Sequence, residues 1–270
     1  MKYRLTTTIL ILLIATSAYT QLSFDSRFKT EVLPIADTNG DGEISQAEAD
    51  AIIELRLIGK SIGGYEDRFN FATGIEHFTN LRILRIEGHR FIVEMDLSMN
   101  KNLESIYIDE SRITGEFSPQ GPAGPAGPTG RGFLACDLPN LKEFIVTSSN
   151  LERRDNGIIL KGSPMLRKLD FTNNNIDISV STDLEFIRHN PITSMDYTSF
   201  TQLDTLILTG GDEINCSGLS QLKYFSAFRA GLSLVNLTFC PQLDFIDVSN
   251  CNLEDLDICL LYTSPSPRDS

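Results

Sequence analysis

Apolar residues recur along this chain at a fixed spacing, in which positions 1, 4 and 6 of a short segment carry aliphatic or aromatic side chains. Leu81, Leu84 and Ile86 show this spacing first. The pattern returns at Leu103, Ile106 and Ile108; Leu141, Phe144 and Val146; Leu166, Leu169 and Phe171; Leu203, Leu206 and Leu208; Leu222, Phe225 and Ala227; and Leu243, Ile246 and Val248. Alternating apolar and polar residues predict half-buried strands. We therefore expect one short strand in each repeat.

The two repeats that begin at Leu166 and Leu243 fill every position of the pattern L-x-x-L-x-L-x-x-N/C-x-L. They resemble the leucine-rich repeat family. One such repeat cannot bury its own apolar edge, so the resemblance implies a stack of about nine repeats over residues 52–258. The expected fold class is therefore an α/β leucine-rich repeat solenoid with short parallel strands and a mostly irregular or 3₁₀ convex side. One irregular unit is expected to use Leu184, Phe186 and Ile192.

Side chains alternate across a strand, so the residues between the aliphatic positions face outward on the concave side of the solenoid. Tyr224 and Phe245 occupy the same outward position in adjacent strands, which lie about 4.8 Å apart. Together with Phe228 and Asp247 they predict an exposed aromatic patch with an acidic neighbour. Patches of this kind can be recognition surfaces, and these four residues are our candidate ligand-binding site.

An acidic segment from Asp37 to Glu48 precedes the repeats and matches the calcium-loop pattern D-x-[DN]-x-[DN]-G-x5-E at every constrained position. It resembles an EF-hand loop. Calcium takes several oxygen ligands at once, and a glutamate at the twelfth position closes the shell with both oxygens. The expected ligands are Asp37, Asn39, Asp41, the backbone carbonyl of Glu43, Ser45 acting through a water, and Glu48.

A helix is expected on each side of the acidic loop. Between Leu22 and Ala36, apolar residues follow a helical spacing at Phe24, Phe28, Val32 and Ile35. A second helix is expected from Ser45 to about Ile53. Residues 22–56 would then form a calcium-binding cap, in which structural Ca²⁺ shields the open end of the first repeat. A single calcium loop before such repeats resembles secreted Bacteroidetes-type leucine-rich repeat proteins.

Both ends of the sequence have features that set them apart from the repeats. Residues 1–20 contain Lys2 and Arg4, a short apolar run and small residues, which is the pattern of a secretory signal peptide. Residues 259–270 resemble the translation of a sequencing adapter, so we expect an artefact tail on a truncated protein. We expect a secreted or cell-surface protein with no membrane span after signal cleavage. Apart from Cys259 in this tail, the chain has four cysteines, Cys136, Cys216, Cys240 and Cys251. They allow three disulfide pairings, and the sequence does not choose among them.

The repeat period fails once, because Leu103 and Leu141 are 38 residues apart (141 − 103). The excess coincides with a glycine- and proline-rich insertion at residues 118–132, which contains four Gly-X-Y triplets. An exposed loop, an assembly chimera and a collagen-like stalk each explain this composition. The sequence leaves these alternatives open.

Charge and motifs exclude some classes of function. The net charge of −13 disfavours binding to nucleic acid through phosphates. Gly59-Lys60-Ser61 resembles the end of a phosphate-binding loop, but Glu54 stands where that motif needs glycine, so we expect no nucleotide. His77, His89 and His189 belong to no catalytic motif.

We therefore expect a non-enzymatic, secreted calcium-binding module that recognises an extracellular protein or glycan and acts in recognition or adhesion. The alternative is a non-catalytic accessory region of a truncated secreted enzyme, such as a glycoside hydrolase. The full-length reading frame would distinguish the two, because a hydrolase domain beyond residue 258 would favour the second.

Overall fold

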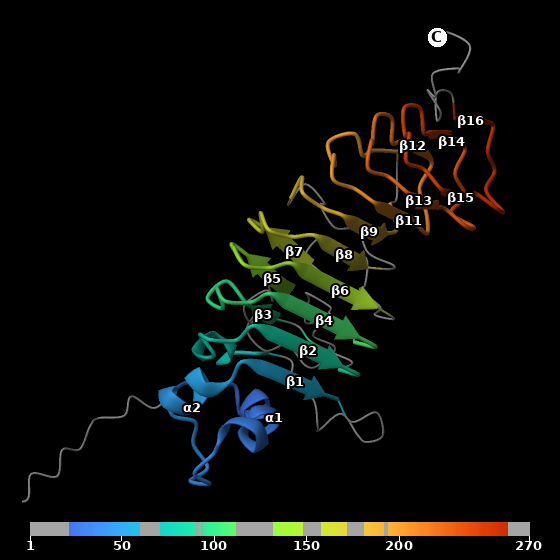
Figure 1. The fold of residues 1–270 in the computed structure, drawn as a ribbon. Helices are drawn as coiled ribbons and strands as arrows, with labels where there is room; N and C mark the ends of the chain where they lie inside the picture. Colours follow the sequence, from blue (N-terminus) through green and yellow to red (C-terminus); the bar gives the residue numbers. More distant parts are fainter. Residues whose placement is uncertain are drawn as a thin grey trace, which may run out of the picture.

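The computed structural model describes residues 22–59, 71–89, 92, 94–111, 132–147, 158–171, 181–191 and 194–258. The expected signal peptide, the adapter-like tail and residues 118–131 of the insertion lie outside the described residues. Within them, nine parallel strands form one continuous sheet, here called the main sheet (Figure 1). Its strands are, in spatial order, β1 (Glu54–Ile58), β2 (Ile83–Glu87), β4 (Ser105–Asp109), β6 (Glu143–Thr147), β8 (Lys168–Phe171), β9 (Phe186–His189), β11 (Thr205–Leu208), β13 (Tyr224–Ser226) and β15 (Phe245–Asp247).

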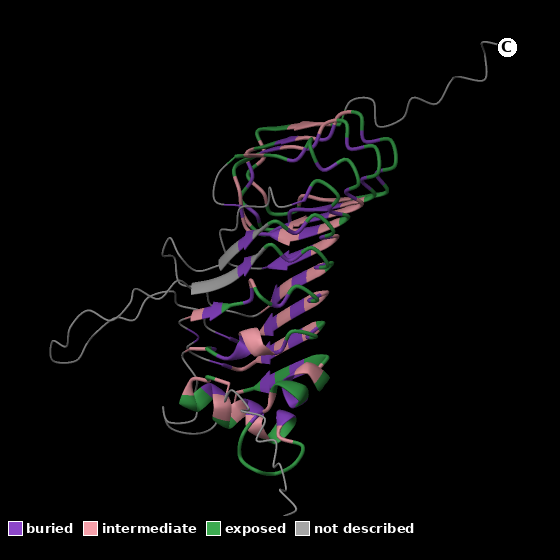
Figure 2. Cartoon of the chain, turned by 90° about the vertical axis from the view of Figure 1, so that its left-hand side faces the viewer, coloured by how far each residue is buried: buried purple, intermediate pink, exposed green. Residues whose placement is uncertain are grey.

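The aliphatic positions of the repeats form the core of this stack. Neighbouring strands pair in register, so that Leu55, Leu84, Ile106 and Phe144 lie side by side in successive strands. These four side chains are fully buried, and the residues next to them along each strand are more exposed (Figure 2). Parallel strands alternate their side chains between two faces, so one face of the main sheet packs inward and the other points outward. The predicted solenoid is thus confirmed.

On the opposite side of the solenoid, the described residues form two further parallel sheets. One comprises β3 (Glu94–Asp96), β5 (Gly132–Cys136) and β7 (Ile158–Lys161); the other comprises β10 (Met195–Asp196), β12 (Glu213–Asn215), β14 (Leu234–Asn236) and β16 (Asp255–Asp257). The 3₁₀ helix η2 (Ile75–His77) precedes β2. In the described residues this side is therefore richer in strands than the sequence indicated. Each return segment is short, so successive segments can pair directly.

The irregular unit uses different inward residues from those predicted. Leu184 and Ile187 are fully buried and His189 is 3% exposed, whereas Phe186 is only half-buried and lies on the outward face of β9. The assignment of Phe186 to the core was wrong because the spacing from Leu184 was taken one residue too short. Ile192 lies outside the described residues.

Two helices cover the start of the stack. Helix α1 (Ser26–Ala36) begins at Asp25, whose carboxylate accepts the backbone N–H groups of Arg27 at 3.0 Å and Phe28 at 3.1 Å. Helix α2 (Gln46–Ala51) lies beside it near β1 (Figure 1). The inward face of α1 consists of Phe28, Val32 and Ala36. Ile35, which was predicted to face inward, is 39% exposed because Ala36 takes that position.

Candidate functional site

The acidic loop between the two helices is held in shape by its own side chains. Asp37 accepts the backbone N–H groups of Gly40 at 2.7 Å and Gly42 at 2.9 Å. Asn39 accepts the N–H of Asp41, which in turn accepts the N–H of Glu43, each at 2.8 Å. Gly42 has φ +82°, a left-handed conformation that favours glycine. The three predicted side-chain ligands at the front of the loop therefore each accept hydrogen bonds from within it.

Glu48 connects the two ends of the loop. Its Oε1 accepts hydrogen bonds from the backbone N–H and hydroxyl of Thr38, both at 2.9 Å, and from the N–H of Asn39 at 3.2 Å. Its Oε2 accepts the backbone N–H and hydroxyl of Ser45, at 2.9 and 2.8 Å. These bonds, those from Ser45 above all, lower the pKa of Glu48 from 4.5 to about 2. Glu48 is therefore a carboxylate at neutral pH, as a calcium ligand must be.

The remaining predicted ligands are compatible with a calcium loop. Glu43 directs its side chain to Lys29, with Oε2 and Nζ 2.6 Å apart, and was predicted to contribute only its backbone carbonyl. Ser45 caps α2, and buried Ile44 anchors the loop in the core. Among the described residues, however, no group of three or more His, Cys, Asp or Glu side chains is gathered to hold a metal ion. The donors have the chemistry that calcium prefers, and calcium binding remains a prediction.

The structure brings together two of the four predicted ligand-binding residues. The rings of Tyr224 on β13 and Phe245 on β15 are stacked, with centroids 4.5 Å apart and planes 5° from parallel. Phe245 is 43% exposed. Asp247 lies two residues along the same strand, and hydrogen bonds from Ser249 lower the pKa of its carboxyl. This stacked pair and its acidic neighbour are here called the Tyr–Phe surface.

Phe228 lies apart from the strand positions of that surface. It follows β13 in a turn, four residues beyond Tyr224, and is 46% exposed. The guanidinium of Arg229 lies over its ring, 5.0 Å from the centroid. Arg229 has φ +58°, because the chain turns sharply at this point. Phe228 therefore contributes an aromatic group to the rim beyond the strand.

A second group of outward residues lies at the centre of the main sheet, and the two that β9 contributes, Phe186 and Arg188, were missed at the sequence level. The Nζ of Lys168 and the guanidinium of Arg188 lie 5.4 and 5.8 Å from the ring centroid of Phe186. Arg188 also approaches Asp170 on β8, with Nη1 and Oδ2 3.3 Å apart. Burial raises the pKa of Asp170, and the two cations oppose that effect. Aligning Ile187 and His189 with the repeat would have placed Phe186 and Arg188 on the outward face.

The histidines have structural surroundings. The ring Nε2 of His189 is hydrogen-bonded to the hydroxyl of Tyr197, and both residues are buried. Burial lowers the pKa of His189 from 6.5 to about 4, so its imidazole is neutral at physiological pH. His89 is also buried, and its backbone N–H donates to the hydroxyl of Ser111 at 3.2 Å. The Nε2 of His77 lies 3.1 Å from the carbonyl oxygen of Ser23.

Three of the four cysteines considered above are free thiols in the described residues. Cys216 and Cys240 are buried, and the Sγ of Cys240 donates to the carbonyl of Cys216 at 3.2 Å. Cys251 is half-buried and its Sγ donates to the carbonyl of Ala227 at 2.9 Å. Burial raises the pKa of Cys216, which makes this thiol a weak nucleophile. The side chain of Cys136 lies outside the described residues.

No helix in the described part of the chain has the length and apolar character needed to cross a bilayer.

No protein-family model matches the sequence, and no curated protein matches it significantly. Solved structures do match. Internalin C2 from Listeria monocytogenes is 17% identical with a TM-score of 0.54, and the alignment covers 83% of this chain and 93% of that one.

Two further solved structures from the same bacterium align less closely. Internalin F is 17% identical with a TM-score of 0.37, covering 86% of this chain and 88% of that one. The functional domain of InlJ is 19% identical with a TM-score of 0.47, covering 87% and 62%. The finer resemblance, to Bacteroidetes proteins with a calcium loop, stays a prediction. The chain has the leucine-rich repeat solenoid fold that internalin C2 also has.

Proposed function

We propose that this chain is a secreted or cell-surface recognition module that binds an extracellular protein through the outward face of its main sheet. In this proposal residues 22–56 form the cap and residues 52–258 the binding solenoid, and the module itself is non-catalytic. Bound Ca²⁺ would supply a structural clasp across the acidic loop, with Asp37, Asn39, Asp41, the Glu43 carbonyl, Ser45 and Glu48 around it. The hydrogen bonds within the loop support this proposal, because they already hold the loop in a turn. The ion would hold the cap against the first repeat.

The observation that carries the proposal is the Tyr–Phe surface. Aromatic side chains on the outward face of a sheet leave part of their apolar surface in contact with water. Residues of this type are common at the centre of protein interfaces. Tyr224 and Phe245 stack on each other, so their geometry is fixed before a partner arrives. A rigid pair loses little conformational entropy on binding, which favours affinity. Asp247 adds a charged group beside them.

The test is a selection of binding partners from a displayed library of extracellular protein domains, followed by affinity measurements. The double variant Tyr224→Ala/Phe245→Ala should weaken binding of the selected partner by at least tenfold, because each aromatic hot spot contributes about 2 kcal/mol or more. Phe239→Ala is the matched control, since Phe239 is 56% exposed but lies outside the main sheet. Equal affinities for the double variant and the control, with unchanged circular dichroism, would refute the proposed surface.

A further inference from the structure

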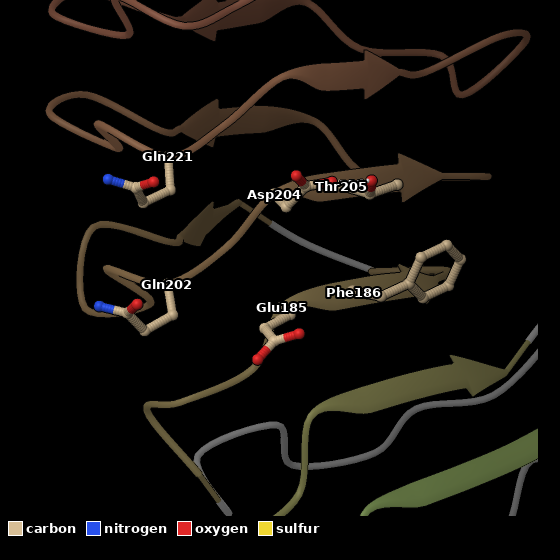
Figure 3. Close-up of a pocket in the computed structure, with 6 residues that line it drawn as sticks. All are labelled: Glu185, Phe186, Gln202, Asp204, Thr205 and Gln221. Atoms are coloured by element: carbon tan, nitrogen blue, oxygen red, sulfur yellow. Dashed lines mark hydrogen bonds between the residues drawn. The ribbon is translucent and has the colours of Figure 1, made fainter.

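A hollow of about 450 Å³ lies beside the main sheet, where the turns lead into β9, β11 and β13 (Figure 3). Its lining residues are Glu185, Phe186, Gln202, Asp204, Thr205 and Gln221. The hollow is broad and open to solvent, so what it could bind is inferred from its side chains. The hollow adjoins the Tyr–Phe surface, because Thr205 in its lining pairs with Tyr224 on the next strand. The inference rests on other residues, Gln202 and Gln221, so it can be tested apart from the function proposed above.

A hollow of similar size, about 470 Å³, lies in the first half of the solenoid, and its polar side chains serve to connect neighbouring repeats. Its carboxamides all bond to the backbone of the preceding turn: Asn80 to the carbonyl of Asp50 at 2.9 Å, Asn102 to that of Thr79 at 3.0 Å, and Asn140 to that of Lys101 at 3.1 Å. Its carboxylates have partners as well, because Glu104 accepts from both Arg82 and Lys142, and Asp50 accepts hydrogen bonds from Gln46 and Thr79. These side chains join one repeat to the next.

The hollow beside β9, β11 and β13 has carboxamides at the same repeat position, but these do not bond to the preceding turn. Gln202 and Gln221 directly precede Leu203 and Leu222, as Asn102 precedes Leu103. Both glutamines are exposed, they point in the same direction in Figure 3, and neither makes a hydrogen bond with the described residues. A primary amide offers two donors and a carbonyl acceptor. Two neighbouring repeats therefore present available hydrogen-bonding groups at the spacing of the strands.

The rest of the hollow adds acceptors and an apolar surface. The carboxylate of Glu185 is exposed, and its ion pair with Arg167 is long, with 3.8 Å between Oε1 and Nε. Asp204 is engaged by Lys223 at 2.7 Å and by the Thr205 hydroxyl at 2.8 Å, so its charge is balanced. Phe186 provides an aromatic surface at the strand side of the hollow. The hollow therefore combines hydrogen-bond donors and acceptors, one exposed carboxylate and one aromatic ring.

This combination matches the chemistry of a carbohydrate. A sugar ring has hydroxyl groups that donate and accept hydrogen bonds around its rim, and C–H groups that pack on an aromatic face. A polyanion is disfavoured by the exposed Glu185 and by the net charge of −13. In Figure 3 the ring of Phe186 lies on the opposite side of the hollow from Gln202 and Gln221. We propose that this hollow binds a neutral glycan, with Phe186 packing on one sugar ring and with Gln202, Gln221 and Glu185 bonding to hydroxyl groups of the adjoining sugars.

The experiment uses the full chain in native gels cast with a soluble polysaccharide, because a protein of this charge migrates well without detergent. The neutral probes are hydroxyethylcellulose, galactomannan and dextran, and polygalacturonate is the anionic probe. At least one neutral polysaccharide should retard the protein. Gln202→Ala/Gln221→Ala and, separately, Phe186→Ala should each raise the apparent Kd at least tenfold.

Asn252→Ala and Phe239→Ala are the controls, since each removes an exposed amide or aromatic group outside the hollow. Both should keep the retardation of the unmodified chain. Circular dichroism and the melting temperature should stay the same in every variant, which separates lost binding from lost folding. The inference is overturned if no neutral probe retards the protein, if only polygalacturonate does, or if the hollow variants behave like the controls.

Discussion

The first and last strands of the main sheet differ in what covers their inward side chains. In β1, Leu55 and Leu57 are at most 1% exposed, because the cap helices lie at that end of the stack. In β15, Ile246 and the following Val248 occupy equivalent repeat positions but are only half-buried. The difference shows that a repeat in this fold owes its burial to a neighbour on each side rather than to its own sequence.

The two halves of the solenoid also differ in how they use the carboxamide that directly precedes the first leucine of a repeat. In the first half, the amides of Asn80, Asn102 and Asn140 bond to the preceding turns. In the second half, Gln202 and Gln221 hold the same repeat position without such bonds. The amides of the first half therefore contribute to stability, whereas those of the second are available to a ligand. Three of the four predictions test these two contrasts and one tests the buried His189 of β9, from the largest expected effect to the smallest.

The largest effect should come from removing a core side chain in a strand with neighbours on both sides. Ile106→Ala should lower the free energy of unfolding by about 3 to 4 kcal/mol, because it leaves a cavity in a fully buried stack. Ile246→Ala removes the same atoms from the same repeat position in β15 and should cost only about 1 kcal/mol, because that side chain is half-buried. Urea unfolding followed by circular dichroism measures both. Equal costs would contradict the contrast.

Calcium should stabilise the capped end selectively. A ligand that binds only the folded state, present at 100 times its Kd, adds about 2.7 kcal/mol to the stability of the region it holds. Hydrogen exchange of β1 and β2 should therefore slow in calcium, while exchange of β13 and β15 should change little. Asp37→Ala should abolish the effect, and Asp212→Ala, an exposed carboxylate remote from the loop, should leave it intact. Identical exchange in calcium and in excess chelator would rule out the clasp.

Mild acid should weaken the molecule through His189. Its folded pKa of about 4 lies below the unfolded value of 6.5, so the unfolded chain takes up the proton first as the pH falls. Stability should therefore drop between pH 6.5 and 4, with about 2 kcal/mol lost by pH 5. His189→Leu/Tyr197→Phe gives this repeat an aliphatic side chain and removes the buried hydroxyl, and should flatten the profile from pH 7 to 5. A slope that survives in the variant would assign the effect elsewhere.

The smallest effect concerns the carboxamides. Asn102→Ala should cost about 1 kcal/mol, because it removes a hydrogen bond to the carbonyl of Thr79. Gln221→Ala should stay within about 0.5 kcal/mol of the unmodified chain, as expected for an exposed side chain without partners. Thermal melts of the two variants under the same conditions provide the comparison. A larger loss for Gln221→Ala would mean that the glutamines are structural too.

Repeat spacing alone determined most of this fold. Leu81, Leu84 and Ile86 have the period of a strand with one buried face, and the same period in later repeats forces the strands to stack in parallel. The turn of the acidic loop is also a local feature, since Gly42 has the left-handed backbone that favours glycine, whereas calcium binding by Asp37 and Glu48 stays a prediction. Patterns of this kind are local, so they can be identified before any long-range contact is known.

Only the tertiary structure decided which outward residues act together. Phe186 was misplaced and Arg188 was missed, because a single-residue error in register moves every side chain of a strand to the other face. Whether Gln221 bonds as Asn102 does depends on where the preceding turn lies, and whether Ile246 is covered depends on the next strand. Contacts between residues some 20 positions apart are set by the packing of whole repeats, which no short stretch of sequence encodes.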